Sequence, residues 1–454
     1  MLALGRATFC PSSLLTWSCA QTNRSPVSIF GDRLRADLFV GLALRGAGAV
    51  SGFAFSWLIS RFFGASTLGL LQVALVTSAL AANFAGQGLD RILVREASIA
   101  FGRDEPSIAH DLFNIAIWRQ FAVGGLLSFV VFALAGWFAR AVTETAQAAP
   151  FLRVLAPAVL AMAVIRLCAA LLRARGSVLV SQALDGVSYT GFATVALALA
   201  WTIGWRDPLS PAITYLGGVL LVAAIGLVLA RHSSPVDKIA STAREKQHLS
   251  TLPGLKIALM VGMALCVDWI ALLLLTSRFG PAEAGIYRVA LQFCLLFTLV
   301  NSSFAMMAGP HIARAAAKGD SSALTLTLRK TAIAGVAVSL PVLALLLIFA
   351  KQALGFFGKE FEAGETALRI VALAQFANVA FGPVGESLIM MKREGRVLAI
   401  EAIALGAGLS AMAILLDPFG MTGVAIGTAI GILVRNALSA LAAGRQIRRL
   451  VGSA

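Results

Sequence analysis

Long apolar stretches dominate the sequence and restrict the folds open to it. Between clusters of charged, glycine and proline residues lie twelve mostly apolar stretches, each close to the roughly 20 residues that a helix needs to cross a bilayer. A transmembrane β-strand needs only about 10 residues and would alternate in hydrophobicity. With 59% hydrophobic and 13% charged residues, the chain has too little polar surface to cover a soluble globule. We therefore predict an all-α, polytopic membrane protein.

The predicted spans divide the chain into two halves joined by a polar linker. We expect a disordered cytoplasmic tail over 1–36, an N-terminal six-helix bundle over 37–230, a cytoplasmic linker over 231–252, a C-terminal six-helix bundle over 253–443 and a short cytoplasmic tail over 444–454. The spans are 37–59, 67–88, 112–138, 151–172, 178–203, 211–230, 253–277, 285–307, 329–350, 363–391, 397–416 and 420–443.

Positive charge is distributed unevenly between the two sides of the predicted membrane. Of 37 Lys and Arg residues, 24 lie in the two tails or in the even-numbered loops, and six lie in the odd-numbered loops. The positive-inside rule then places both termini in the cytoplasm, for which we expect the cell inner (cytoplasmic) membrane. The basic residues behind the net charge of +15 thus lie mostly on one side of the membrane, and no nucleic acid partner is expected.

A short stretch of the first half returns in the second half, 216 residues later. FGASTLGLLQVAL begins at Phe63, and FGPAEAGIYRVAL begins at Phe279. Further matches at this offset are LRV at Leu152 with LRI at Leu368, and GRD at Gly102 with KGD at Lys318, which aligns Asp104 with Asp320; a three-residue insertion then falls around Gly382-Pro383. Six spans separate equivalent points, so both halves enter the membrane from the same side. Parallel repeats of this kind predict two bundles around a central cavity.

Two glycines recur in each copy of the repeated stretch. Gly64 and Gly69 correspond to Gly280 and Gly285, and each pair brackets a short polar segment between two apolar runs. This pattern predicts a tight hairpin on the outer face. The glycines either only permit the turn or also act as hinges of a gate, and the sequence leaves both open.

Several motifs resemble the Wzx-type polysaccharide flippases of the multidrug/oligosaccharidyl-lipid/polysaccharide exporter superfamily. The resemblance covers about residues 35 to 445 and rests on Arg61-Phe62-Phe63-Gly64 with Gly69, Gly86-Gln87-Gly88-Leu89, Leu93-Val94-Arg95-Glu96-Ala97, Gly309-Pro310-His311-Ile312-Ala313, Lys318-Gly319-Asp320 and Gly395-Arg396. It implies a transporter that moves a lipid-linked oligosaccharide diphosphate from the cytoplasmic to the outer leaflet for surface polysaccharide synthesis, including lipopolysaccharide or exopolysaccharide. Membrane lipids and a polysaccharide polymerase are the other partners that it implies.

Seven arginines lie inside the predicted spans, where a lipid-facing charge costs about 2.5–3.5 kcal/mol. We expect Arg153, Arg288 and Arg369, near the outer ends of their helices, to extend to the interface. Arg45, Arg166, Arg435 and Arg119 lie deeper, and we predict that they face a cavity and bind the substrate, since guanidinium groups bind phosphate bidentately. Arg45 is flanked by Gly41, Gly46 and Gly48, which would let its helix approach a neighbour closely.

Acidic residues within the spans are fewer. Asp268, near the middle of the seventh span, has no polar neighbour in sequence. It is predicted to be a proton or cation coupling site, a partner that neutralises Arg45 in the empty cavity, or a structural ion pair between the halves. Asp185, Glu386 and Glu401 are expected at the cytoplasmic interface.

Other functions fit the sequence less well. A membrane-bound polymerase or ligase needs a large outer loop, whereas the longest odd-numbered loops, 139–150 and 351–362, are short. The sequence shows no metal, nucleotide or nucleophile motif, so we expect a non-enzyme without cofactors, driven by an ion gradient, the membrane potential or consumption of the product. A drug/cation antiporter and a peptidoglycan-precursor flippase of the same superfamily remain as alternatives. The excess of buried arginine over carboxylate favours an anionic cargo.

Overall fold

The structure, a computed structural model, describes residues 26–144, 146–232, 251–391 and 393–452. These residues are nearly all helical, and no strand occurs among them. The predicted tail and linker lie mostly outside the described residues, at 1–25 and 233–250. Of the predicted tail, residues 26–36 belong to the first helix, which begins at Pro26. The prediction of an all-α polytopic membrane protein is confirmed.

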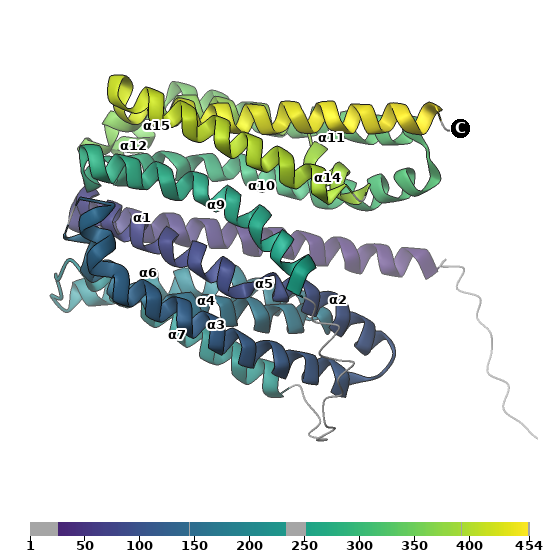
Figure 1. The fold of residues 1–454 in the computed structure, drawn as a ribbon, viewed down its shortest axis with the longest axis horizontal. Coiled ribbons are helices and arrows are strands. Elements are labelled where there is room, and N and C mark those ends of the chain that lie inside the picture. The colour runs from purple at the N-terminus through teal and green to yellow at the C-terminus, as the bar shows by residue number, and fades with distance from the viewer. Residues whose placement is uncertain (1–25, 145, 233–250, 392, 453–454) are drawn as a thin grey trace, which may run out of the picture.

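The chain folds into two helical bundles that lie side by side (Figure 1). The N-terminal half comprises α1 (Pro26–Gly86), α2 (Leu89–Gly102), α3 (Pro106–Ala141), α4 (Ala148–Ala174), α5 (Val178–Gln182), the π-helical turn η1 (Ala183–Val187), α6 (Ser188–Thr202) and α7 (Ser210–His232). The C-terminal half comprises α9 (Thr251–Phe279), α10 (Pro281–Lys318), α11 (Ser321–Ile348), α12 (Ala350–Gly355), the 3-10 turn η2 (Lys359–Gly364), α13 (Glu365–Ala380), α14 (Val384–Met390) and α15 (Glu394–Gly452). The halves meet where α1 packs against α9 and α10.

The described helices are sufficient for twelve membrane crossings. Nine are long and apolar enough to cross a bilayer, and α13 with α14 forms a bent tenth. Two of the nine, Ala43–Gly86 with 44 residues and Glu394–Arg448 with 55, exceed the roughly 20 residues of one crossing. Each contains a glycine with non-helical backbone angles, Gly64 or Gly420, that divides it into two crossings. The start of α1 and the end of α15 accordingly lie at the same end of the molecule (Figure 1).

The insertion around Gly382-Pro383 breaks one helix of the C-terminal half. Gly382 has a positive φ of 71°, and the proline that follows cannot continue the hydrogen-bond ladder of α13. As a result α13 and α14 meet at an angle of 42°. The equivalent helix of the first half, α4, runs unbroken and is largely buried. The two halves therefore differ in shape where the second copy carries three more residues.

The repeated stretches form the point at which the two halves cross. Gly64 and Gly280 have φ angles of 80° and 92°, which confirms the predicted tight turns at both positions. Gly69 of α1 and Gly285 of α10 lie inside the helices that follow. A Cβ atom on Gly69 would overlap the carbonyl oxygen of Pro281, and one on Gly285 would overlap that of Ala65. Since Pro281 is the repeat equivalent of Ala65, the same backbone contact is made twice, once from each half.

Further contacts between the halves repeat this symmetry with different chemistry. The ring of Phe53 on α1 packs edge-on against Phe293 on α10, with centroids 5.2 Å apart. At the equivalent positions, 216 residues away in each case, the Trp269 indole on α9 donates a hydrogen bond of 2.9 Å to the Thr77 hydroxyl on α1. The repeat thus conserves which positions touch across the interface, while the side chains that touch have changed.

The aspartates that the repeat aligns have different roles, and this difference can be measured. Asp320 is the N-cap of α11, where its carboxylate accepts hydrogen bonds from the Ala323 N–H and the Ser322 hydroxyl, and these bonds lower its pKa. Asp104 instead lies in the turn before α3 with a positive φ of 62°, and the N-cap of α3 is the next residue, Glu105, whose side chain makes no capping bond. Replacing Asp320 with alanine should therefore lower the melting temperature in detergent slightly, whereas Glu105→Ala should not. Because the folded-state pKa is depressed, the effect should be complete above the ordinary aspartate pKa of about 4 and should fade as the pH falls through the lowered value.

Candidate functional site

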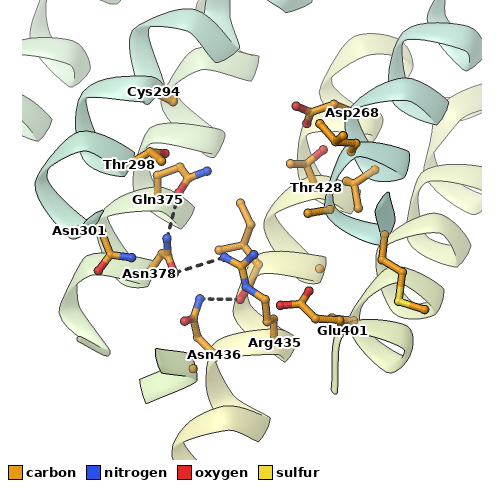
Figure 2. A pocket seen from close by; sticks show the side chains of 18 of the residues that line it. Asp268, Cys294, Thr298, Asn301, Gln375, Asn378, Glu401, Thr428, Arg435 and Asn436 are labelled. Atoms are coloured by element: carbon orange, nitrogen blue, oxygen red, sulfur yellow. Dashed lines mark hydrogen bonds between the residues drawn. The ribbon is translucent and has the colours of Figure 1, made fainter. Parts of the chain in front are cut away.

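The C-terminal half encloses the larger cavity, with a volume of about 540 Å³ (Figure 2). Its walls come from α9, α10, α13, α14 and both parts of α15. The bend between α13 and α14 contributes Gly382, Gly385 and Glu386 to the wall. The sequence insertion therefore shapes this cavity directly. The polar side chains that line it are Asp268, Arg288, Gln292, Thr298, Asn301, Ser302, Gln375, Asn378, Glu386, Glu401, Thr428, Arg435, Asn436 and Ser439.

Arg435 is held in this cavity by side-chain amides. Its guanidinium donates a hydrogen bond of 3.3 Å to the Asn378 side-chain oxygen, and the Asn378 nitrogen donates one of 3.2 Å to Gln375. The carboxylate of Glu401 lies on the other side of Arg435 (Figure 2). A guanidinium has five N–H donors, so an arginine held by this amide contact keeps further donors available to a phosphate or a hydroxyl group in the cavity.

Asp268 lies in the same cavity and pairs with Arg288. An Asp268 carboxylate oxygen is 3.7 Å from the Arg288 Nη1, with the two side chains 41% and 26% exposed. Asp268 lies 11 residues before Phe279 at the end of α9, a distance of roughly 16 Å along the helix, which is about half the thickness of a hydrocarbon core. Both members of the pair belong to the C-terminal half, so it is not an ion pair between the halves. Arg45 does not take part in it.

A smaller cavity of about 250 Å³, here called the N-terminal cavity, lies near the start of α2, and α9 of the C-terminal half closes one side of it. Arg166 of α4 and Asp185 of η1 line it, together with Arg91 and Asp90 of α2. Asp185 also lies 3.8 Å from Arg173. It sits in a π-helical turn, a local widening of a helix that often occurs at functional sites.

The four arginines predicted to bind substrate do not converge on one site. Arg435 and Arg166 line two different cavities. Arg45 is exposed at the interface between α1 and α10, where it donates to the sulfur of Met306 at 3.4 Å. Arg119 donates to the side-chain oxygen of Gln87 in the turn between α1 and α2. Neither Arg45 nor Arg119 is among the residues that line the two cavities.

Four charged residues line cavities that the sequence did not assign to them. Arg288 was expected to extend to the outer interface, yet it points into the C-terminal cavity. Its helix begins at Pro281, four residues before the predicted start at residue 285, so Arg288 lies deeper. Glu386 and Glu401 also line this cavity, and Asp185 lines the N-terminal one, a role that the sequence did not predict for them. Arg153 is exposed and Arg369 is partly buried.

The cavities are not cationic overall, contrary to the excess of buried arginine in the sequence. In the C-terminal cavity Arg288 and Arg435 face Asp268, Glu386 and Glu401. In the N-terminal cavity the two arginines are matched by two aspartates. The sequence-based balance was wrong because it left Asp90, Asp185, Glu386 and Glu401 out of the cavities.

Aromatic side chains are absent from the described residues that line either cavity. Tyr287, which neighbours Arg288 in sequence, is buried and hydrogen-bonded to Thr428 instead. The walls of the larger cavity consist of amides, hydroxyls, small aliphatic side chains and the charged groups described above. This composition suits a cargo rich in hydroxyl groups better than a flat aromatic one.

Two duplicated bundles of membrane-crossing helices, each with a polar cavity, define the architecture of a polytopic transporter-like membrane protein. Residues 257–414 match the MatE family model, which covers much of the C-terminal half. No curated protein is significantly similar to the chain in sequence.

Solved structures share the fold over almost the whole chain. An inward-facing multidrug resistance MATE family transporter of the MOP superfamily aligns with a TM-score of 0.74 and 15% identity, over 92% of this chain and 99% of that one. The lipid II flippase MurJ in an inward closed conformation aligns with a TM-score of 0.69 and 14% identity, over 89% and 87%. A MOP superfamily transporter from Pyrococcus furiosus, with a binding pocket of reverse polarity, aligns with a TM-score of 0.66 and 14% identity, over 92% and 95%. The chain therefore has the fold of MOP superfamily transporters, and none of these neighbours is described as an enzyme.

Proposed function

We propose that this protein is a flippase, which moves a polyprenyl diphosphate-linked oligosaccharide from the cytoplasmic to the outer leaflet by alternating access. The observation that carries the proposal is the lining of the C-terminal cavity, where side-chain amides and hydroxyls surround Arg435 without an aromatic residue among the described lining. Amides and hydroxyls can exchange hydrogen bonds with sugar hydroxyls, and a guanidinium can bind the diphosphate. The fold supports the proposal, since it is shared with a lipid II flippase.

The proposal assigns roles to the predicted site residues. Arg435 and Arg166 bind phosphate oxygens from opposite halves, and Arg45 and Arg119 attract the anionic head group at the cytoplasmic ends of α1 and α3. Carboxylates beside the arginines offset their charge in the empty cavities, so the cargo replaces an internal partner when it binds. Both termini are cytoplasmic in this proposal, and a polysaccharide polymerase in the outer leaflet consumes the product.

Arginine variants provide the test of cargo binding. The purified protein is reconstituted into liposomes containing a fluorescent polyprenyl diphosphate oligosaccharide, and translocation is followed by exposure of the glycan to an added glycosidase. Arg435→Ala and Arg166→Ala should each lower the rate about tenfold, the loss expected when one charge-assisted hydrogen bond to phosphate is removed. Arg175→Ala, an exposed arginine outside both cavities, should leave the rate unchanged. Unaltered translocation in both cavity variants would contradict the proposal.

A drug/cation antiporter is the second candidate, because the C-terminal cavity has three carboxylates against two arginines. Such a transporter would bind an organic cation beside Asp268 or Glu401. The missing aromatic walls count against it, since cation–π contact is the usual means of holding aromatic cations. Accumulation of a fluorescent aromatic cation in the same liposomes under a proton or sodium gradient, with no movement of the lipid-linked glycan, would favour the antiporter. If the lipid-linked glycan does move, comparing translocation of different glycans would separate polysaccharide export from transport of a peptidoglycan precursor.

A further inference from the structure

A single hydrogen bond joins equivalent positions of the two repeats. The Arg288 Nε on α10 donates to the Gln72 side-chain oxygen on α1 at 3.1 Å, and the two residues are 216 positions apart. They follow Gly69 and Gly285 by three residues each, so this bond lies one helical turn further into the membrane than the crossing of the two backbones. In one half the position holds a neutral amide and in the other a permanent cation.

The same guanidinium also reaches into the C-terminal cavity. Its Nη1 pairs with Asp268, which lines the cavity together with Arg288 itself. The first repeat lacks this arrangement, because Gly52 occupies the position of Asp268 and Gln72 that of Arg288. One side chain thus connects the contact between the halves with the group expected to meet the cargo.

Other contacts hold the outer ends of the two halves together. The Ala65 N–H, at the start of the second part of α1, donates a hydrogen bond of 2.8 Å to Glu360 of η2. The Trp57 indole donates one of 3.0 Å to the Phe356 backbone oxygen. Both join the N-terminal hairpin to the loop that follows α11, so the outer end is closed in this structure. Neither of these two contacts extends to a residue that lines the cavities.

We propose that Arg288 is a latch that couples loading of the C-terminal cavity to opening of the outer end. In the closed state its guanidinium is divided between Gln72 and Asp268. A phosphate binds a guanidinium through two charge-assisted hydrogen bonds, which are stronger than one bond to a neutral amide. An anionic cargo in the cavity therefore draws Arg288 away from Gln72 and weakens the contact between α1 and α10. The identity of this cargo rests on the proposed function, whereas the latch between Gln72 and Arg288 does not.

The latch itself can be tested without cargo. The five native cysteines are replaced, spin labels are attached at Ser66→Cys and Ala282→Cys, which are equivalent positions beside the crossing, and the distance between them is measured by double electron–electron resonance in nanodiscs. Gln72→Ala should raise the population with a long separation about tenfold, as expected for loss of one hydrogen bond to a charged group. Gln72→Glu forms an ion pair with Arg288 and should reduce that population.

A control and a cargo measurement separate the two hypotheses. Ser60→Ala removes a hydrogen bond that stays within α1 and should not change the distances. Addition of a polyprenyl diphosphate to the unmodified latch should lengthen the separation, as Gln72→Ala does. If Gln72→Ala lengthens it and the lipid does not, the latch stands and the proposed cargo is wrong. If neither Gln72 variant changes the distances in protein that elutes as a single species, the latch is wrong, whatever the cargo.

Discussion

Alanine at Gly69 or Gly285 is expected to abolish transport while leaving each bundle folded. A Cβ atom at either position would overlap a backbone carbonyl oxygen of the opposite half, and a backbone cannot turn aside as a flexible side chain can. The helices would have to separate at the crossing, at an overpacking cost of about 1–3 kcal/mol against the closed outer end. Such a cost favours the open outer end by about tenfold or more, and the alternating cycle would stall.

The measurement combines translocation in liposomes with the distance between spin labels at positions 66 and 282. Both variants should show a longer separation and a transport rate at least about tenfold lower. Gly217→Ala on α7 is the matched control, because a Cβ atom there would meet nothing within 4 Å. Normal transport in Gly69→Ala and Gly285→Ala would show that the crossing can loosen without consequence, and the glycines would then serve packing alone.

The crossing also shows what the sequence could predict. The repeat aligned Gly69 with Gly285 and Gln72 with Arg288, and both pairs meet across the interface. Matching positions in parallel repeats face each other when they lie near the axis that relates the halves. The sequence could not tell which repeated positions lie near that axis, because helices were placed only by length and hydropathy. It therefore predicted hairpins at Gly64 and Gly280 but not the contact beyond them.

Hydropathy predicted the number of membrane crossings more reliably than it predicted which way each charged side chain faces. Twelve crossings were expected, and the breaks at Gly64 and Gly420 divide the two longest described helices accordingly. Whether a charged side chain faces a cavity or the lipid depends on where its helix starts and on which helices pack around it. A shift of four residues in the start of α10 moved Arg288 from the predicted interface into the cavity.

The candidate site was predicted only in part for the same reason. Arg166, Arg435 and Asp268 line cavities, whereas Arg45 and Arg119 lie outside them. Glu386 is in the wall because an insertion bends the chain between α13 and α14, and Asp185 is there because a π-helical turn widens its helix. Both are local departures from a straight helix, which hydropathy does not detect. The sequence signal for Glu386 was the insertion at Gly382-Pro383. The signal for the contact between Gln72 and Arg288 was the repeat offset of 216 residues.

Removing the charge of Asp268 alone should damage both stability and transport. Asp268→Asn leaves Arg288 in a membrane cavity without its anionic partner. Losing one member of a fully buried pair costs about 3–5 kcal/mol, and the water that reaches these two side chains should reduce the cost to about 1–3 kcal/mol. We therefore expect a clear fall in melting temperature in detergent and a translocation rate at least about tenfold lower.

The double variant Asp268→Asn with Arg288→Gln separates structure from transport. Removing both charges relieves the unpaired guanidinium, so the melting temperature should return close to that of the unaltered protein. Transport should remain lost, because the cavity then has neither the latch nor the acidic group that restores it after cargo release. The pair Glu365 with Arg369, 2.8 Å apart and partly exposed, provides the control: Glu365→Gln with Arg369→Gln should change neither stability nor transport appreciably. Recovery of transport together with stability in the Asp268 and Arg288 double variant would make that ion pair purely structural.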